Sequence, residues 1–355
     1  MMKPLMTLFL LFASSSGWAF PEMIRHGYSR CTVCHVASDG GGVLTPYGRV
    51  LSNEVLSTWG EEKESNVAYG VLTLPEWAQL GGDFRVIQTH LDTPAFTQGR
   101  TILMQADLEL ALGYEAFTLV GTVGYQSDFL SRRHYLSYAP SDDLTLRFGK
   151  FRKAFGLSTA DHVIETERGL GFDQGTETYN LEVAWWSGDF ELFVTGQLGR
   201  IDRAVTGEQG ASLRTAVAFE DTYKAGISYF YGSTSGGRSR HVAGPYAMLG
   251  ISPDFFILAE VDIQKANPLS GADLTGIVYY TRFDYELIQG LHLYLTQELN
   301  RPSFKSSTGQ RSLTSLGMQW FPRPHFEFLL AYQNIFLRGN GSTSHFLYGM
   351  AHFYL

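Results

Sequence analysis

Apolar and polar residues alternate along most of the chain, from Trp77 to Leu355. A period of two residues places successive side chains on opposite faces of a β-strand. Because the pattern recurs so often, it predicts an all-β architecture in which each strand has one apolar and one polar face. The alternation is clearest in residues 104–112, 144–149, 179–185, 255–263 and 291–299.

The polar faces of these predicted strands often carry charge, although a soluble sandwich could also alternate. Inward charges around a polar interior, with apolar residues facing outward, are expected of a barrel that spans a membrane. The charged residues are Asp83, Arg85, Asp107, Glu109, Arg147, Glu182, Glu260, Asp262, Arg282, Asp284 and Glu298.

The connections between the predicted strands alternate in length. Short turns at one end and long loops at the other are typical of outer-membrane barrels. Tight links are expected at 114–115, 140–143, 187–189, 220–222, 252–254, 288–290 and 322–324. Longer polar loops are expected at 151–175, 232–240, 267–272, 301–310 and 338–344.

The predicted strands number about sixteen, an even number, as in single-chain bacterial barrels. We therefore predict a transmembrane barrel of about sixteen antiparallel strands over residues 77–355, with a soluble all-β fold as the alternative. The last segment, 345–355, has Leu347, Phe353 and Leu355 on one face. It resembles the terminal strand of outer-membrane barrels.

Composition agrees with a membrane barrel. Aromatic residues make up 14% of the chain and charged residues only 17%, with a net charge of -8. This balance excludes a disordered chain and a basic nucleic-acid-binding surface. Aromatic residues near the strand ends fit the girdles at membrane interfaces: Trp77, Tyr114, Phe117, Trp185, Trp186, Tyr223, Phe255, Trp320, Phe321 and Phe326.

The N-terminus has the pattern of a secretory signal. Lys3 precedes an apolar run from Leu5 to Ala13, and Gly17-Trp18-Ala19 offers a small-residue cleavage site. The apolar run is too short to span a bilayer. Residues 1–19 are therefore predicted to be a signal peptide. With the barrel, this predicts location in the outer membrane of a Gram-negative-type bacterium, in contact with its lipid.

The two cysteines of the chain lie in Cys31-Thr32-Val33-Cys34-His35. This spacing is the signature of c-type haem attachment: two thiols bond one porphyrin, and the adjacent histidine binds the iron. We predict one covalent haem c, with His35 as proximal iron ligand, and assign no catalytic residue. A structural zinc site, a redox Cys-x-x-Cys pair and a local disulfide remain alternatives.

The sixth iron ligand has several candidates, because residues 36–76 contain neither Met nor His. Upstream of the motif, Met23 and His26 are the distal candidates. An open position is a further alternative, and it would give the iron a different potential. Barrel residues that could serve instead are His90, Met104 and His134.

The haem segment is predicted to span residues 20–58, and a charged linker residues 59–76. Its glycines at 40–42 allow close approach to a porphyrin, and Arg49 is a candidate partner for a propionate. About forty residues are too few for an independent core. We therefore expect a short irregular or helical segment that plugs the barrel lumen or lies in the periplasm, since a barrel of this size encloses a lumen.

The order of these features resembles the fused outer-membrane cytochrome–porins. The resemblance rests on Pro21, Arg25, the haem motif, the stretch 44–49 (Leu-Thr-Pro-Tyr-Gly-Arg) and the alternating barrel. Where that family usually has a Phe-Ala-Arg-Gln-Thr-like run, this chain has 23–28 (Met-Ile-Arg-His-Gly-Tyr), which keeps Arg25. The family is associated with Fe(II) oxidation at the cell surface and with electron transfer to periplasmic carriers.

Three functional hypotheses follow from the sequence. The first is electron transfer across the outer membrane between external Fe(II), or another extracellular redox partner, and a periplasmic cytochrome or other carrier. The second is a diffusion porin with a haem plug or sensor segment, and the third a haem enzyme with an open iron site. Loop residues could gather Fe(II), unless they form an ordinary solvated loop: Asp161, His162, Glu165, Glu167 and Asp173.

Overall fold

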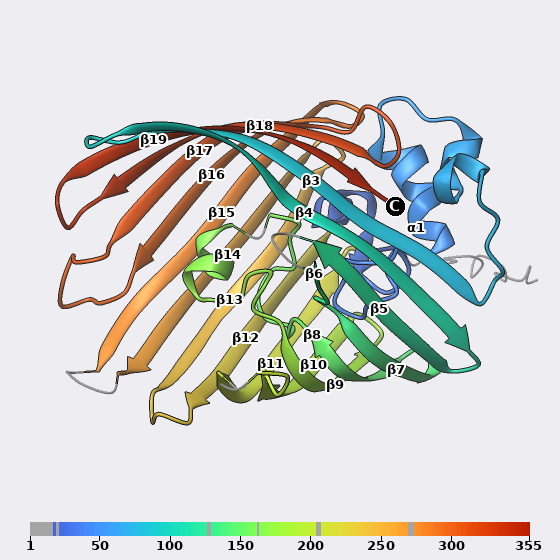
Figure 1. Ribbon diagram of the computed structural model, residues 1–355, viewed down its shortest axis with the longest axis horizontal. Helices are drawn as coiled ribbons and strands as arrows, with labels where there is room; N and C mark the ends of the chain where they lie inside the picture. Colours follow the sequence, from blue (N-terminus) through green and yellow to red (C-terminus); the bar gives the residue numbers. More distant parts are fainter. Residues whose placement is uncertain (1–16, 19–20, 126–128, 162, 204–206, 269–272) are drawn as a thin grey trace, which may run out of the picture.

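The computed structural model describes residues 17–18, 21–125, 129–161, 163–203, 207–268 and 273–355. Its main feature is a closed antiparallel β-barrel, with a short, partly helical N-terminal segment at one end (Figure 1). The fold predicted from the sequence is confirmed. Apart from Gly17 and Trp18, the predicted signal peptide lies outside the described residues, as does His162.

In the described part of the chain, sixteen strands of eight or more residues form the wall. They are β3 (Ala78–Asp92), β4 (Thr97–Tyr114), β5 (Phe117–Tyr125), β7 (His134–Ser141), β8 (Leu144–Phe151), β9 (Thr178–Ser187), β10 (Phe190–Gly199), β11 (Glu208–Phe219), β12 (Tyr223–Thr234), β13 (Ser239–Ser252), β14 (Phe255–Asn267), β15 (Leu274–Ile288), β16 (Leu291–Arg301), β17 (Arg311–Trp320), β18 (Phe326–Leu337) and β19 (Ser342–Tyr354). The two-residue β6 (Phe129–Leu130) pairs with the end of β5.

The barrel closes where the last strand meets the first. β19 pairs antiparallel with β3, from His345 opposite Asp92 to Tyr354 opposite Asp83. Each long strand pairs with its neighbours in the sequence, so the wall is a meander of hairpins. This closure leaves few free sheet edges, as a wall that crosses lipid requires.

The wall has one local irregularity beside β4. β3 pairs with β4 from Thr97 to Leu112, whereas β5 pairs with β4 only from Asp107 to Tyr114. Among the described residues, the stretch from Thr97 to Ala106 therefore has a strand partner on one side only. The wall is lower on the side of β5, β7 and β8.

Polar side chains of the strands face the lumen and apolar ones face outward, as predicted. In β9, Glu182 and Ala184 are buried in the lumen, whereas Leu181 and Val183 face outward and are exposed. Ten of the eleven charged residues predicted to face inward are buried, and the side chain of Asp83 is 17% exposed. The interior is thus polar and the exterior apolar, which confirms the predicted facing of the strands.

Five of the ten residues of the predicted aromatic girdle are exposed near the strand ends, including Trp77 and Tyr114, and three more are partly exposed. The prediction is wrong for Trp186 and Phe321, which are both 2% exposed. Trp185 faces outward, so its neighbour Trp186 must point into the lumen. Phe321 packs inside against residues of the N-terminal segment and the end of β19.

The N-terminal segment consists of short elements. They are β1 (Gly17–Trp18), η1 (Pro21–His26), β2 (Tyr28–Arg30), α1 (Pro46–Leu51), η2 (Ser52–Leu56), η3 (Glu62–Ser65) and η4 (Val67–Gly70). No helix in the described residues combines the length and the apolar character needed to cross a bilayer.

The segment lies at the short-turn end of the barrel. The backbone N–H of Thr58 donates to the carbonyl of Phe321 (2.8 Å), and that of Trp59 donates to Pro322 (3.0 Å). The guanidinium of Arg323 contacts Glu64. Short turns face the periplasm in outer-membrane barrels. Figure 1 shows α1 beside the C-terminus at this end.

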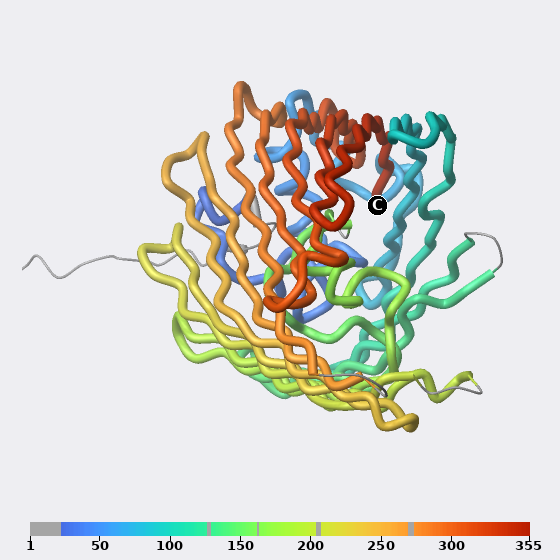
Figure 2. The backbone as a smooth tube through the Cα atoms, turned by 90° about the vertical axis from the view of Figure 1, so that its left-hand side faces the viewer, coloured from blue at the N-terminus to red at the C-terminus, as the bar shows by residue number. Residues whose placement is uncertain are grey.

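A long loop at the opposite end folds back into the barrel. It connects β8 to β9 and carries the helical turn η5 (Glu165–Gly169). Leu157 and Ile164 of this loop are buried against wall residues, among them Tyr246 and Phe256. Figure 2 shows this light green loop and the blue N-terminal segment within the ring of strands. Both segments therefore occupy the lumen.

Candidate functional site

The Cys-x-x-Cys-His motif forms a single helical turn. The backbone N–H of His35 donates to the carbonyl of Cys31 (3.0 Å). The chain then returns alongside itself, because Val36 N–H bonds to Val43 and Thr45 N–H bonds to Cys34 (2.9 Å). This geometry holds both cysteines and the histidine in one compact unit.

Three consecutive glycines form the tight turn that brings residues 43–45 back beside the motif. Gly40, Gly41 and Gly42 have φ values of +90°, +74° and +69°, a region that side chains with a Cβ rarely adopt. A Cβ on Gly40 would lie 3.3 Å from the sulfur of Cys31. The three glycines therefore keep the backbone close to the motif.

Helix α1 packs directly on the motif. Thr45 caps its N-terminus, with the hydroxyl accepting from Gly48 N–H (3.1 Å), and Pro46 occupies the first turn. A Cβ on Gly48 would lie 2.4 Å from the carbonyl oxygen of Cys34. Glycine at this position allows the helix to approach the cysteine backbone.

Buried polar contacts fix the motif against the barrel wall. Arg147 of β8 pairs with Asp39 (2.8 Å) and with Glu182 of β9 (2.7 Å). The hydroxyl of Ser38 donates to Glu182 (3.0 Å). Lys224 of β12 donates to the carbonyl of Ser29 (2.8 Å). Buried charges need such partners, so the wall residues stabilise the N-terminal segment and the segment in turn neutralises the charges of the wall.

Arg25 provides a second anchor. Its guanidinium pairs with Glu286 (2.8 Å), and both side chains are almost completely buried. The same group lies over the ring of Phe256, 5.6 Å from its centroid. The arginine noted before the haem motif thus attaches the segment to the lumen wall.

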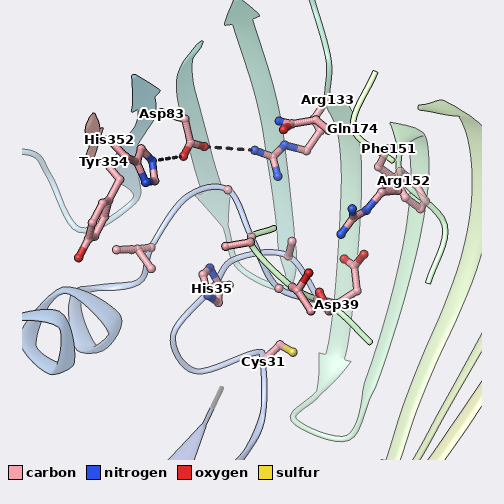
Figure 3. A pocket seen from close by; sticks show the side chains of 18 of the residues that line it. Cys31, His35, Asp39, Asp83, Arg133, Phe151, Arg152, Gln174, His352 and Tyr354 are labelled. Atoms are coloured by element: carbon pink, nitrogen blue, oxygen red, sulfur yellow. Dashed lines mark hydrogen bonds and ion pairs between the residues drawn. The ribbon is translucent and has the colours of Figure 1, made fainter. Parts of the chain in front are cut away.

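A cavity with about 1510 Å³ of empty space, part of it open to solvent, lies beside Cys31 and His35 (Figure 3). Cofactor sites commonly have about 300–1,000 Å³. Its apolar lining includes Phe151, Met248 and Phe321. Cationic side chains of the wall and loops also line it: Arg85, Arg133, Arg147, Arg152 and Lys224.

Part of the motif fits a c-type haem, whereas Cys34 is buried against Met23 and Leu51 and is not among the cavity-lining residues that the structure describes. Cys31 and His35 face one cavity, apolar side chains could contact a porphyrin, and the cationic side chains could meet its propionates. Burial lowers the pKa of His35 to about 4. The imidazole is therefore neutral at neutral pH, which is the form that binds a metal.

The predicted distal candidates lie elsewhere. Met23 packs with Cys34 and Leu51, and His26 accepts a hydrogen bond from Arg25 (3.0 Å). Of the alternative barrel ligands, His90 is exposed and His134 bonds to Ser131 and Tyr179. None of these, nor Met104, is among the cavity-lining residues described by the structure.

Two potential ligands that sequence reasoning missed do line the cavity, Met248 of β13 and His352 of β19. The imidazole of His352 lies between Glu327 (2.7 Å) and Asp83 (2.9 Å). Alternation marks such residues as inward-facing. It does not show that strands so far apart in sequence meet beside the motif.

The other predicted contacts also differ in position. Arg49 donates to the carbonyl of Leu44 (2.9 Å) and stabilises its own helix entry. The loop acids lie inside the lumen, where Glu165 pairs with Arg311 and Glu167 with Arg152 (both 2.7 Å). Within the described residues, no group of three or more His, Cys, Asp or Glu side chains is arranged to hold a metal ion.

No family model and no curated protein matches this sequence. Solved structures do match. OmpT of Vibrio cholerae has a TM-score of 0.62 at 12% identity, covering 80% of this chain and 100% of that one. The outer membrane channel DcaP of Acinetobacter baumannii has 0.60 at 12% identity, with 80% and 99% covered. An anion-selective porin from Comamonas acidovorans has 0.61 at 10% identity, with 78% and 99% covered.

These matches show that the chain has the fold of outer-membrane porin-like barrels. The closed wall and the apolar exterior are those of a protein in the outer membrane, in contact with its lipid. The prediction of a membrane barrel is confirmed, and the soluble alternative is excluded.

Proposed function

We propose that this outer-membrane barrel carries one haem c on Cys31, Cys34 and His35 and transfers electrons between the cell exterior and a periplasmic carrier. The observation that carries the proposal is the lumen cavity that Cys31 and His35 face, with its apolar and cationic lining. The order of motif, helix and barrel resembles that of the fused cytochrome–porins.

The chain's own residues have distinct roles in this proposal. Cys31 and Cys34 would hold the group covalently, and His35 would bind its iron. Arg85, Arg133 and Lys224 line the cavity and pair with Asp83, Glu109 and Glu191, so the propionates would share these cations with the wall carboxylates. A bound haem would supply a one-electron couple, whose potential depends on axial ligation and burial.

The position of the cavity favours transfer rather than a free periplasmic cytochrome. A hydrocarbon core is about 30 Å thick, too far for one electron-tunnelling step. The segment is anchored inside the lumen through Arg25 and Asp39, with the cavity toward the short-turn end. A periplasmic carrier would approach from that end, and an external donor or acceptor such as Fe(II) from the long-loop end.

A diffusion porin in which the segment serves as a plug or sensor is the second candidate. The structural matches favour it, because they include a channel and a porin. Against free diffusion stands the filling of the lumen by two segments, the N-terminal one and the loop 152–177. This candidate predicts solute flux and a haem that does not respond to external redox agents.

Reconstitution into liposomes tests both candidates. The full chain would be inserted with its orientation verified by external protease, and Fe(II) added outside while the haem α-band is followed. Electron transfer predicts reduction by external Fe(II), added free or as an anionic chelate, and none in a Cys31→Ala/Cys34→Ala variant. An α-band that ignores every impermeant agent, together with sugar entry in a swelling assay, would establish the porin instead.

A further inference from the structure

The long-loop end of the lumen contains a second cavity. It has about 1040 Å³ of empty space, including space open to solvent. It is lined by loop residues, among them Lys153, Arg200 and Arg203, and by the ends of β10 and β11, including Gln197 and Glu208. Solutes from outside the cell would meet this outer cavity before the one at His35.

A small inner cavity of about 340 Å³ lies between the two. It shares Lys153 with the outer cavity. It shares Asp39, Arg152 and Ser158 with the cavity at His35. The three cavities thus follow one another along the lumen, and Lys153 lies at the boundary between the outer cavity and the inner one.

Lys153 is a buried cation without an anionic partner. The residue is 8% exposed, and its ammonium nitrogen lies 4.0 Å from the ring centroid of Phe172 and 4.6 Å from that of Phe230. Among the described residues, no ion pair or hydrogen bond to this ammonium group is found. A buried charge is costly unless a counter-charge meets it, and aromatic rings supply only part of that stabilisation.

The surrounding charges leave the outer cavity positive. Its acidic residue, Glu208, is already occupied by a two-point contact with Arg240 (2.7 Å and 2.7 Å). The guanidinium of Arg200 donates to the carbonyl of Gly175 (3.0 Å), which leaves its charge uncompensated. Arg203 is exposed at the rim. A free divalent cation would be repelled here, whereas an anion would find donors on several sides.

We propose that the outer cavity binds a small multivalent carboxylate or oxyanion, with Lys153 at its inner end and Arg203 at its rim. The redox partner at this end would then be an anionic metal chelate rather than a free metal cation. That redox role rests on the proposed electron-transfer function, whereas the binding itself does not.

Calorimetry with citrate tests the binding. The full-length protein in detergent micelles at low salt is titrated with citrate, next to the variants Lys153→Gln and Arg203→Gln. Loss of one charged donor is expected to weaken citrate binding about tenfold or more for Lys153→Gln. The matched control is Lys265→Gln, since Lys265 lies on β14 away from the cavity with its side chain 56% exposed. Its affinity for citrate should equal that of the unchanged protein.

Two results would overturn the anion site. One is that the unchanged protein shows no saturable citrate binding. The other is that both cavity variants bind citrate with the affinity of the unchanged protein. If Lys153→Gln does not fold, judged by heat-dependent migration of the barrel, the exposed Arg203→Gln decides alone. The outcomes remain separable from the proposed function. Citrate binding with a haem that ignores external donors rejects electron transfer only, and the reverse pattern rejects the anion site only.

Discussion

Arg147 on the barrel wall forms a 2.8 Å ion pair with Asp39, the residue that follows the haem motif by four positions, and both side chains are buried. The same guanidinium lies 4.0 Å from the ring centroid of Phe151 and also holds Glu182. One wall residue therefore links the N-terminal segment, the neighbouring strand and the cavity.

Replacing this arginine should loosen the segment. Arg147→Met leaves two buried carboxylates without their cation, and we expect a loss of about 3–5 kcal/mol in the free energy of unfolding. Guanidinium unfolding in detergent micelles measures the loss. Lys150→Met, on the same strand and paired with the partly exposed Asp202, should cost less than about 1 kcal/mol. Equal effects of the two variants would contradict the anchoring role.

In the haem protein that we propose, the tight turn at Gly40–Gly42 should control how much haem is attached. Gly40→Ala places a side chain at φ +90° and 3.3 Å from the Cys31 sulfur, so we expect a strain of about 1–2 kcal/mol and less attached haem per chain. The ratio of α-band to protein absorbance measures loading. Gly121→Ala, which adds a Cβ into open space, should load normally. Full loading of Gly40→Ala would show that the tight return is dispensable.

Substitution of candidate iron ligands should distinguish His35 of the motif from the nearby Met23. In the haem protein that we propose, His35→Gln would remove the nitrogen that binds the iron, and we expect covalent haem with a high-spin spectrum. Met23→Leu should leave the spectrum unchanged, because Met23 packs on Cys34 and Leu51 rather than lining the cavity. Visible and near-infrared spectra of both variants show which of the two residues binds the iron. A spectral change in Met23→Leu would mean that Met23 reaches the iron.

Citrate binding should weaken as the pH rises through neutrality. Burial, followed by the charge of Arg240, lowers the pKa of Lys153 to about 7, so its ammonium form prevails below that pH and is lost above it. Arg152 opposes and Glu208 favours the charge, while Phe172 and Phe230 cover it. Calorimetry from pH 6 to 8.5 should show the decrease in the unchanged protein. In Lys153→Gln the affinity for citrate should remain nearly flat over this range.

Removing the folded-in loop should open the lumen. Replacing residues 155–175 by a short Gly-Ser linker deletes Leu157, Ile164 and Phe172, which pack against the wall inside the barrel. We expect single-channel conductance in planar bilayers to rise severalfold. A linker of the same composition inserted after Gly341, where a Cβ meets no neighbour, should leave the conductance unchanged. Unchanged conductance after the deletion would show that this loop does not limit flux.

The sequence predicts the faces of the strands better than their relative heights. Glu182 and Asp284 were correctly expected inside, because a period of two residues decides which face a side chain occupies. Trp186 lies inside because its position in that alternation, and not its aromatic ring, decides the face that it occupies. The distance of each residue along the barrel axis depends on the stagger between neighbouring strands, which local sequence does not specify.

The candidate site was only partly predictable for the same reason. Cys31, Cys34 and His35 form a local motif, and its identification needs no tertiary information. Met248 and His352 lie on strands remote in sequence, so only the barrel closure brings them to one cavity. The inward loop did leave a signal, since Leu157, Leu170 and Phe172 are too apolar for a solvated loop.

The low wall beside β4 limits how deeply the protein can sit in its bilayer. Backbone groups cannot remain unpaired in hydrocarbon, so the stretch from Thr97 to Ala106 must rise above the outer leaflet. The six residues from Asp107 to Leu112 are paired on both sides and span about 16 Å at about 3.4 Å per residue and a tilt of about 40°. That height is less than the apolar band of about 25 Å in such barrels, so we expect the bilayer to be thinner beside this part of the wall. The rim is consequently uneven, and an extracellular partner could reach the level of the lumen loop from the side rather than from above.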